Sequence, residues 1–113
     1  MDRLKGHVIV VTGATKGIGK SIAYGIASEG ADVVIGGRSV SDGELCAEDI
    51  RKKTGREVCF VPGDIAEESS CESLVSKAVS KFGKLSGLVN NAGVFPPVDF
   101  LGLFRRLAKR QLL

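Results

Sequence analysis

The sequence VTGATKGIG, residues 11–19, stands between an apolar run and a segment with helical periodicity. The run before it, residues 7–12 (HVIVVT), is rich in β-branched side chains and predicts a strand buried on both faces. Gly13, Gly17 and Gly19 allow a tight turn and let a phosphate approach the backbone. Because a helix would begin inside this turn, its first N–H groups would face that phosphate. The stretch therefore predicts a phosphate-binding turn, and a glycine loop without a ligand is the simpler alternative.

The alternation of strand and helix continues along the chain. Further strands are predicted at residues 31–37, 57–61 and 85–90, and helices within residues 13–30, 41–54 and 67–82. Strands that alternate with helices usually pair in parallel through right-handed crossovers. The order predicts a doubly wound α/β fold with about four parallel strands and three to four helices, without a linker or repeat before Pro96.

Each predicted helix has an apolar face that would pack on the sheet. The expected faces are Ile18, Ile22 and Ile26 with Ala23 and Ala27 in the first helix, Leu45, Cys46 and Ile50 in the second, and Cys71, Leu74, Val75, Ala78, Val79 and Phe82 in the third. Ser41 and Glu44 have the spacing of a capping box, and Gly30 and Gly55 are placed to end helices. The three cysteines have no zinc spacing and are interpreted as small buried hydrophobic residues.

The end of the second strand indicates which dinucleotide the chain would prefer. In NAD-binding proteins with this type of turn, an acidic residue about twenty positions later binds the ribose 2′-hydroxyl. Here that place holds Gly37, Arg38 and Ser39. A guanidinium can bind a 2′-phosphate through two parallel hydrogen bonds, and Lys16 adds a second cation. The residues favour NADP(H) over NAD(H), unless Arg38 is merely a solvated loop residue.

Three motifs together resemble the short-chain dehydrogenase/reductase family. They are the turn Thr12-Gly13-x-x-x-Gly17-Ile18-Gly19, Asp64 after the third strand, and Asn90-Asn91-Ala92-Gly93 after the fourth. The resemblance covers residues 1 to about 98 and implies the NAD(P)-binding half of a Rossmann-type domain, with residues 99–113 as an atypical basic tail. The remaining motif residues of the turn, Thr15 and Lys16, are included in the expected cofactor site.

The resemblance also implies a role for each motif. The turn would hold the pyrophosphate, Asp64 would meet the adenine with Ile65 beside it, and the segment from Asn90 to Gly93 would line the cofactor ribose. A structural alternative applies to these residues: Asp64 as a turn aspartate, and the two asparagines as buried amides that bind the loop backbone. Within the segment, Asn91 is favoured over Asn90 as a ligand contact.

The catalytic residues of the family are not found in this chain. The family uses a Tyr-x-x-x-Lys pair, a serine and a further asparagine, in which the lysine lowers the pKa of the tyrosine that acts as general acid or base. The chain has one tyrosine, Tyr24, and four residues later stands Ser28. We interpret Tyr24 as a packing residue of the first helix, and we expect no turnover from this chain alone.

The C-terminal residues, 99–113, carry the net charge of the chain. Residues 1–98 contain twelve basic and twelve acidic residues, whereas the tail has Arg105, Arg106, Lys109 and Arg110 against Asp99. A short helix with Phe100, Phe104, Leu107 and Gln111 on one stripe is one interpretation, which Gly102 weakens. We expect an altered C-terminus from about Gly102, through splicing, a shifted frame or truncation; the alternative is a basic amphipathic segment that binds a partner or a membrane surface.

Two functions remain open from the sequence. The first is an NADP-dependent oxidoreductase represented by its cofactor-binding half, with a small-molecule substrate only if the missing half is supplied. The second is a non-catalytic cofactor-binding or regulatory protein. The balanced charge of residues 1–98 favours neither nucleic acid nor membrane as partner. A cytoplasmic location is expected, no metal site is indicated, and the fourth strand would be an exposed edge open to association.

Overall fold

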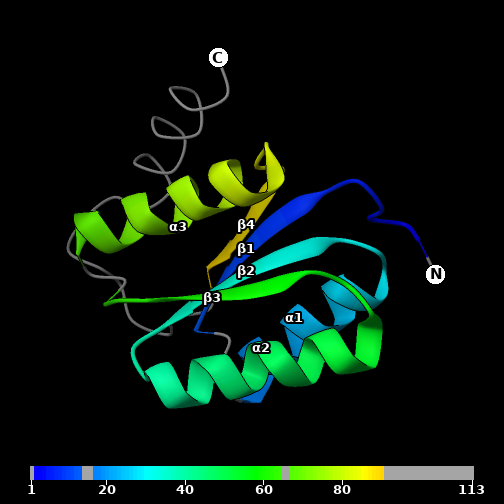
Figure 1. Ribbon diagram of the computed structural model, residues 1–113, viewed down its shortest axis with the longest axis horizontal. Helices are drawn as coiled ribbons and strands as arrows, with labels where there is room; N and C mark the ends of the chain where they lie inside the picture. Colours follow the sequence, from blue (N-terminus) through cyan, green and yellow to red (C-terminus); the bar gives the residue numbers. More distant parts are fainter. Residues whose placement is uncertain (1, 14–16, 65–66, 91–113) are drawn as a thin grey trace.

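Strands and helices alternate along the chain as predicted (Figure 1). The computed structural model describes residues 2–13, 17–64 and 67–90. Its strands are β1 (Val8–Thr12), β2 (Asp32–Gly37), β3 (Val58–Pro62) and β4 (Gly87–Asn90), and its helices are α1 (Gly17–Ser28), α2 (Val40–Thr54) and α3 (Glu68–Phe82). The strands form one parallel sheet in the order β3-β2-β1-β4. Helices α1 and α2 cover one face of the sheet and α3 covers the other, which confirms the doubly wound α/β fold.

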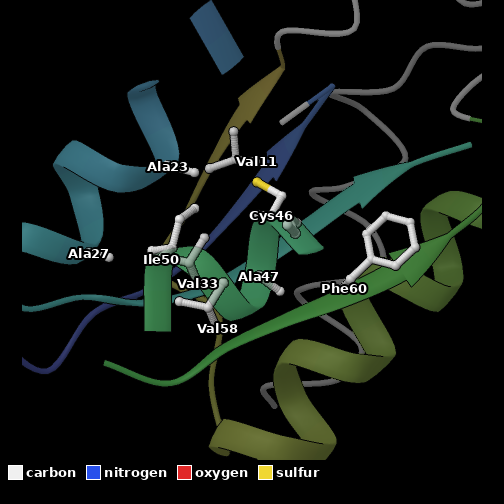
Figure 2. Close-up of a cluster of buried hydrophobic side chains, with 10 residues drawn as sticks. Val11, Ala23, Ala27, Val33, Cys46, Ala47, Ile50, Val58 and Phe60 are labelled. Atoms are coloured by element: carbon white, nitrogen blue, oxygen red, sulfur yellow. The ribbon is translucent and has the colours of Figure 1, made fainter. Parts of the chain in front are cut away.

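A cluster of buried hydrophobic residues lies on each face of the sheet. Alternate residues of β1 point to opposite faces, so that Val10 packs under α3 and Val11 packs under α1 and α2. The α3 cluster contains Val8, Val10, Val34, Cys71, Leu74, Val75, Ala78 and Leu85. The cluster on the other face contains Val11, Ala23, Ala27, Val33, Ile35, Cys46, Ala47, Ile50, Val58 and Phe60 (Figure 2). The sheet is therefore held between two apolar layers, and its strand ends are left for the site.

The predicted faces of α1 and α2 are partly wrong. The buried residues of α1 are Gly19, Ala23 and Ala27, whereas Ile18 is 74% exposed. In α2, Cys46 and Ile50 are buried as expected, but Leu45 is 65% exposed. The physical reason in α1 is that small residues let the helix approach the sheet closely, which turns its larger side chains toward the margin of the contact. Tyr24, expected to pack in the core, is also exposed.

The helix ends follow local backbone chemistry, with one correction at α2. Its N-cap is Ser39, whose side-chain oxygen accepts a hydrogen bond from the Asp42 amide, so the predicted capping box at Ser41 is wrong. The helix begins earlier because β2 ends at Gly37 and leaves only Arg38 before the cap. Gly55 ends α2 with a φ of +72°, in the left-handed conformation that the sequence predicts there.

Strand β4 pairs with β1 alone among the described residues, so it lies at one edge of the described sheet. Its side chains Leu88 and Val89 are partly buried and pack at the margins of the two clusters, one on each face. None of the described helices has the length and apolar character that a membrane crossing would need. The predicted tail at 99–113 lies outside the described residues.

Candidate cofactor-binding site

The predicted site residues follow the carboxyl ends of the parallel strands, which meet at one edge of the sheet. Gly13 follows β1, Arg38 and Ser39 follow β2, Asp64 comes shortly after β3, and Asn90 ends β4. In open α/β sheets, ligands bind outside the carboxyl ends of the strands, where the order of the strands reverses. Here the chain moves outward from β1 to β2 and β3 and then crosses to β4 on the other side of β1. The described site residues therefore surround the switch point of the sheet.

Hydrogen bonds tie the four strand ends together beneath the site. The Gly13 amide donates to the Gly36 carbonyl at 3.0 Å, and the Gly63 amide donates to the Gly37 carbonyl at 2.9 Å. On the other side of β1, the buried Thr12 hydroxyl donates to the carbonyl of Val89 at 3.5 Å. The first two bonds join backbone atoms, so the positions of these turns depend little on the neighbouring side chains. Two of the three hydrogen bonds that join the strand ends next to the site are therefore backbone bonds.

The start of α1 has the features that a phosphate requires. Gly17, the first residue of the helix, has a φ of +63°, and apart from its chain neighbours and its own helix backbone no described atom lies within 4 Å of the position that a Cβ would take there. Gly19 is buried, and Ile18 between them projects into solvent. The first amides of a helix lack partners within the helix and carry the positive end of its dipole. The residues present here fit the pyrophosphate of a dinucleotide.

At the end of β2, Arg38 is exposed and no acidic residue stands between Gly37 and Ser41. The Ser39 oxygen accepts from the Asp42 amide at 3.3 Å and lies 3.4 Å from the Ser41 oxygen. As an acceptor in its cap bond, Ser39 keeps its own proton to donate. This turn combines an exposed guanidinium, hydroxyl donors and a helix N-terminus, all of which favour an anion.

The turn after β3 is shaped by a glycine that the sequence reading did not single out. Gly63 has a φ of +155°, and a Cβ there would lie 2.5 Å from the Ser70 side-chain oxygen. The turn thus packs directly on the first turn of α3. Asp64 follows it, is half-buried, and accepts from the Glu67 amide at 2.9 Å through its backbone carbonyl. The only signal in the sequence was the Pro-Gly pair before the aspartate.

A second glycine lies at the contact between α3 and the sheet. A Cβ on Gly36 would lie 2.9 Å from Leu74 Cδ2, so any larger residue there would force the Leu74 side chain of α3 to shift. Six predicted site residues lie outside the described residues, and their roles stay predictions: Thr15, Lys16, Ile65, Asn91, Ala92 and Gly93. Of Asn90, the structure describes the backbone, which pairs in register with Thr12.

Tyr24 does not belong to a Tyr-x-x-x-Lys pair, because Ser28 stands four residues after it. Its ring lies 6.0 Å from the Lys53 ammonium, near the end of α2, and Ser28 donates its hydroxyl to the Tyr24 backbone carbonyl at 2.8 Å.

Burial raises the pKa of the thiols of Cys46, Cys59 and Cys71, which opposes a nucleophilic role for them. Within residues 2–13, 17–64 and 67–90, no cluster of three or more His, Cys, Asp or Glu residues could hold a metal ion.

The sequence reading also missed an ionic contact between α1 and α2. Lys20 Nζ lies 3.2 Å from Asp49 Oδ2, and Lys53 Nζ lies 3.3 Å from the same oxygen. The hydrogen bond from Lys20 is the first cause that lowers the pKa of Asp49 below its usual range. No sequence pattern pairs residues of two different helices, so this contact had no signal to find.

Comparisons with known proteins agree with this architecture. Residues 7–110 match the family model described as short chain dehydrogenase. The chain is 35% identical over 113 residues to L-fucose dehydrogenase of Rattus norvegicus, covering 100% of this chain and 40% of that protein. It is 40% identical over 105 residues to L-rhamnose 1-dehydrogenase (NAD(P)(+)) of Sphingomonas sp. strain SKA58, covering 91% and 41%.

Solved structures lead to the same conclusion. L-sorbose reductase of Gluconobacter frateurii, complexed with NADPH and L-sorbose, superposes with a TM-score of 0.87 at 29% identity, covering 96% of this chain and 48% of that chain. The chain thus spans less than half the length of these three relatives. The family match reaches residue 110, further than the limit near residue 98 that the motifs predicted. With its family motifs, its strand order and these matches, the chain belongs to the short-chain dehydrogenase family.

Proposed function

We propose that this chain is the NADP(H)-binding portion of a short-chain dehydrogenase/reductase, a family that transfers a hydride between nicotinamide and a carbonyl or alcohol. The observation that carries the proposal is the juxtaposition of two helix starts at one sheet edge. The start of α1 follows the glycine turn, and the start of α2 follows Arg38. NADP(H) carries its pyrophosphate on the 5′ oxygen and a further phosphate on the 2′ oxygen of the adenosine ribose. One cofactor molecule would therefore place a phosphate group at each of the two helix starts.

The cofactor would be distributed over the strand ends in the order of the motifs. The turn from Gly13 to Gly19, including Thr15 and Lys16, would bind the pyrophosphate. Asp64 and Ile65 would bind the adenine, and the segment from Asn90 to Gly93 would line the ribose. When bound, the nicotinamide supplies or accepts the hydride, while the residues of this chain bind and orient the dinucleotide.

The preference for NADP(H) rests on the turn after β2. The exposed guanidinium of Arg38 has no acidic residue beside it and suits a 2′-phosphate. An acidic residue in place of Gly37 or Arg38 would repel that phosphate. One relative was solved with NADPH, which supports this preference, whereas another is named with NAD(P)(+), that is, with either dinucleotide. Lys16 would add a cation from the glycine turn.

Thermal shift and calorimetry with NADPH and NADH test this proposal. We expect NADPH to raise the melting temperature more than NADH at equal concentration, because tighter binding to the folded state stabilises it more. Arg38→Asp should move the preference toward NADH. Arg3→Asp, which changes the charge equally but lies before β1, is the matched control and should keep the NADPH preference. Equal affinity of the unaltered chain for both cofactors would refute the NADP assignment.

We expect no reductase turnover from this chain by itself. Tyr24 has Ser28 in place of the lysine of the family pair, and the Lys53 ammonium lies 6.0 Å from the centroid of its ring. Incubation with NADPH and a panel of ketones, aldehydes and quinones measures this through the absorbance of the reduced nicotinamide. Consumption clearly above the blank, and lost in a Tyr24→Phe variant, would contradict the expectation.

The proposed partners are the dinucleotide and, with the remainder of a catalytic domain, a small-molecule substrate. The edge strand β4, with Leu88 and Val89 partly buried on opposite faces, is the proposed place where further protein associates. A cytoplasmic site of action is proposed as well; expression with a fluorescent tag and fractionation would test it.

A further inference from the structure

The contact between α1 and α2 joins the two helices whose first turns form the proposed cofactor site. Both helices lie on the same face of the sheet (Figure 1). The fully buried residues of α1 and α2 in the cluster on this face are Ala23 and Ala27 of α1 and Cys46, Ala47 and Ile50 of α2 (Figure 2). Apart from Ile50 these side chains are small and interlock little, so polar contacts at the margin add to what fixes the relative position of the helices.

At that margin, two pairs of residues spaced four apart face each other. On α1 the pair is Lys20 and Tyr24; on α2 it is Asp49 and Lys53. Asp49 accepts from Lys20 across the interface at 3.2 Å and from Lys53 in its own helix at 3.3 Å. The Lys53 ammonium then lies 6.0 Å from the centroid of the Tyr24 ring, back on α1. The contacts thus cross between the helices twice, and Asp49 is the one member bound by both lysines.

The side chains of Lys20, Tyr24 and Asp49 are between 35% and 41% exposed, and that of Lys53 is 57% exposed. Water therefore screens these contacts. An exposed ion pair contributes little to the stability of a fold. Its geometric effect is different, because Lys20 belongs to the first turn of α1, directly after Gly19 of the phosphate turn. A small shift there moves the amides that would bind the pyrophosphate.

We propose that Asp49 is a positioning residue for the dinucleotide: by holding Lys20 and Lys53, it fixes the spacing between the phosphate turn before α1 and the Arg38 turn before α2. This inference rests on the proposed function. A ligand bound at both helix starts requires the correct spacing, whereas one bound mainly at α1 does not. Loss of Asp49 should therefore weaken NADPH more than NADH.

The variant Asp49→Asn removes the charge that both lysines bind and keeps the size of the side chain. Its matched control is Glu48→Gln on the same helix, since Glu48 pairs at 2.9 Å with Lys52 within α2 and does not reach α1. Both variants remove one negative charge, so both should change the general attraction for an anionic cofactor to a similar extent. The difference between them isolates the contact across the helices.

Isothermal titration with NADPH and NADH gives the first readout. Relative to Glu48→Gln, we expect Asp49→Asn to reduce the preference for NADPH by about two- to five-fold, the range that one exposed ion pair can supply. Asp49→Glu, which keeps the carboxylate, should restore most of the preference. A lower melting temperature without a change in the preference would assign Asp49 a merely structural role and overturn the proposal. An equal rise in NADPH affinity in both variants would overturn it too, because charge alone would explain it.

Amide hydrogen exchange without cofactor gives a second readout, which separates this inference from the proposed function. Asp49→Asn should speed exchange at residues 17–20, the first turn of α1, and at residues 38–42, the turn before α2 and the first residues of that helix, whereas Glu48→Gln should not. If the unaltered chain binds neither cofactor, the proposed function fails and with it the role of Asp49 in binding. If the chain prefers NADPH but neither the preference nor the exchange changes in Asp49→Asn, the positioning role alone fails.

Discussion

Two helical glycines, one in the first turn of α2 and one in α1, are expected to respond in opposite ways to the same substitution. A Cβ on Gly43 of α2 would lie 2.2 Å from Phe60 Cε1 on β3, with two further ring carbons at 2.3 Å. A Cβ on Gly25 of α1 would meet no atom within 4 Å in the described part of the chain, other than those of its chain neighbours and its own helix backbone. We predict that Gly43→Ala destabilises the chain and that Gly25→Ala stabilises it.

The magnitude follows from two terms. Replacing glycine by alanine inside a helix contributes about 1 kcal/mol of stability at either position. At Gly43 the added methyl group must displace the ring of Phe60 by about 1.3 Å, from 2.2 Å to an ordinary contact near 3.5 Å. The ring is only 8% exposed and has little room, so overpacking should cost about 1–3 kcal/mol. Because the helix term is shared, the two variants should differ by this overpacking cost alone.

Urea unfolding followed by circular dichroism measures the difference as a change in midpoint at constant slope. For a chain of this size, about 2 kcal/mol corresponds to a difference in melting temperature of roughly 8–16 °C. Phe60→Leu should reduce the cost of Gly43→Ala, because a smaller side chain leaves the methyl group room. If both glycine variants shift the midpoint in the same direction by similar amounts, the ring does not lie against α2 and the reasoning is refuted.

Two further predictions concern the turn after β3 and the buried thiol of α3. Gly63→Ala should destabilise the chain by about 1–3 kcal/mol in urea unfolding, because of the φ of +155° and the Ser70 contact; a loss unchanged in a Ser70→Gly background would show that the contact adds nothing. Burial, followed by the charge of Glu68, raises the pKa of Cys71 from 9.0 to about 11. The thiol ionises first in the unfolded chain, so stability should fall as pH rises from about 9 to about 11. Melting temperatures of Cys71→Ala should fall less over this range, and an identical fall would contradict the assignment.

The order of elements and the strand positions could be predicted from the sequence, because both are local. The β-branched runs gave β1 and β2, and Gly55 ended α2 where its left-handed conformation requires. Periodicity alone could not give the buried face of α1. It gives weight to large apolar residues such as Ile18, whereas close packing on a sheet selects small ones, such as Ala23 and Ala27.

For the candidate site, the sequence could supply only the parts that depend on short spacings along the chain. The glycine turn and Arg38 are proposed on that ground, and their roles in binding stay predictions. The cap at Ser39 was missed because it depends on where β2 ends, and a serine two residues later offered a similar pattern. The Lys20–Asp49 contact could not be predicted, since it exists only once two helices lie side by side.

A cofactor site of this kind does not require the catalytic residues in order to form. Its turns are held by backbone bonds, from the Gly13 amide to Gly36 and from the Gly63 amide to Gly37, and these need only the strand pairing. That pairing is stabilised by the two buried clusters, both of which are built from described residues of this chain. Catalysis in the family instead needs side chains placed beyond β4, at the edge where the described sheet ends. We therefore expect binding and chemistry to be separable in this fold, with the residues described here in the NAD(P)-binding region.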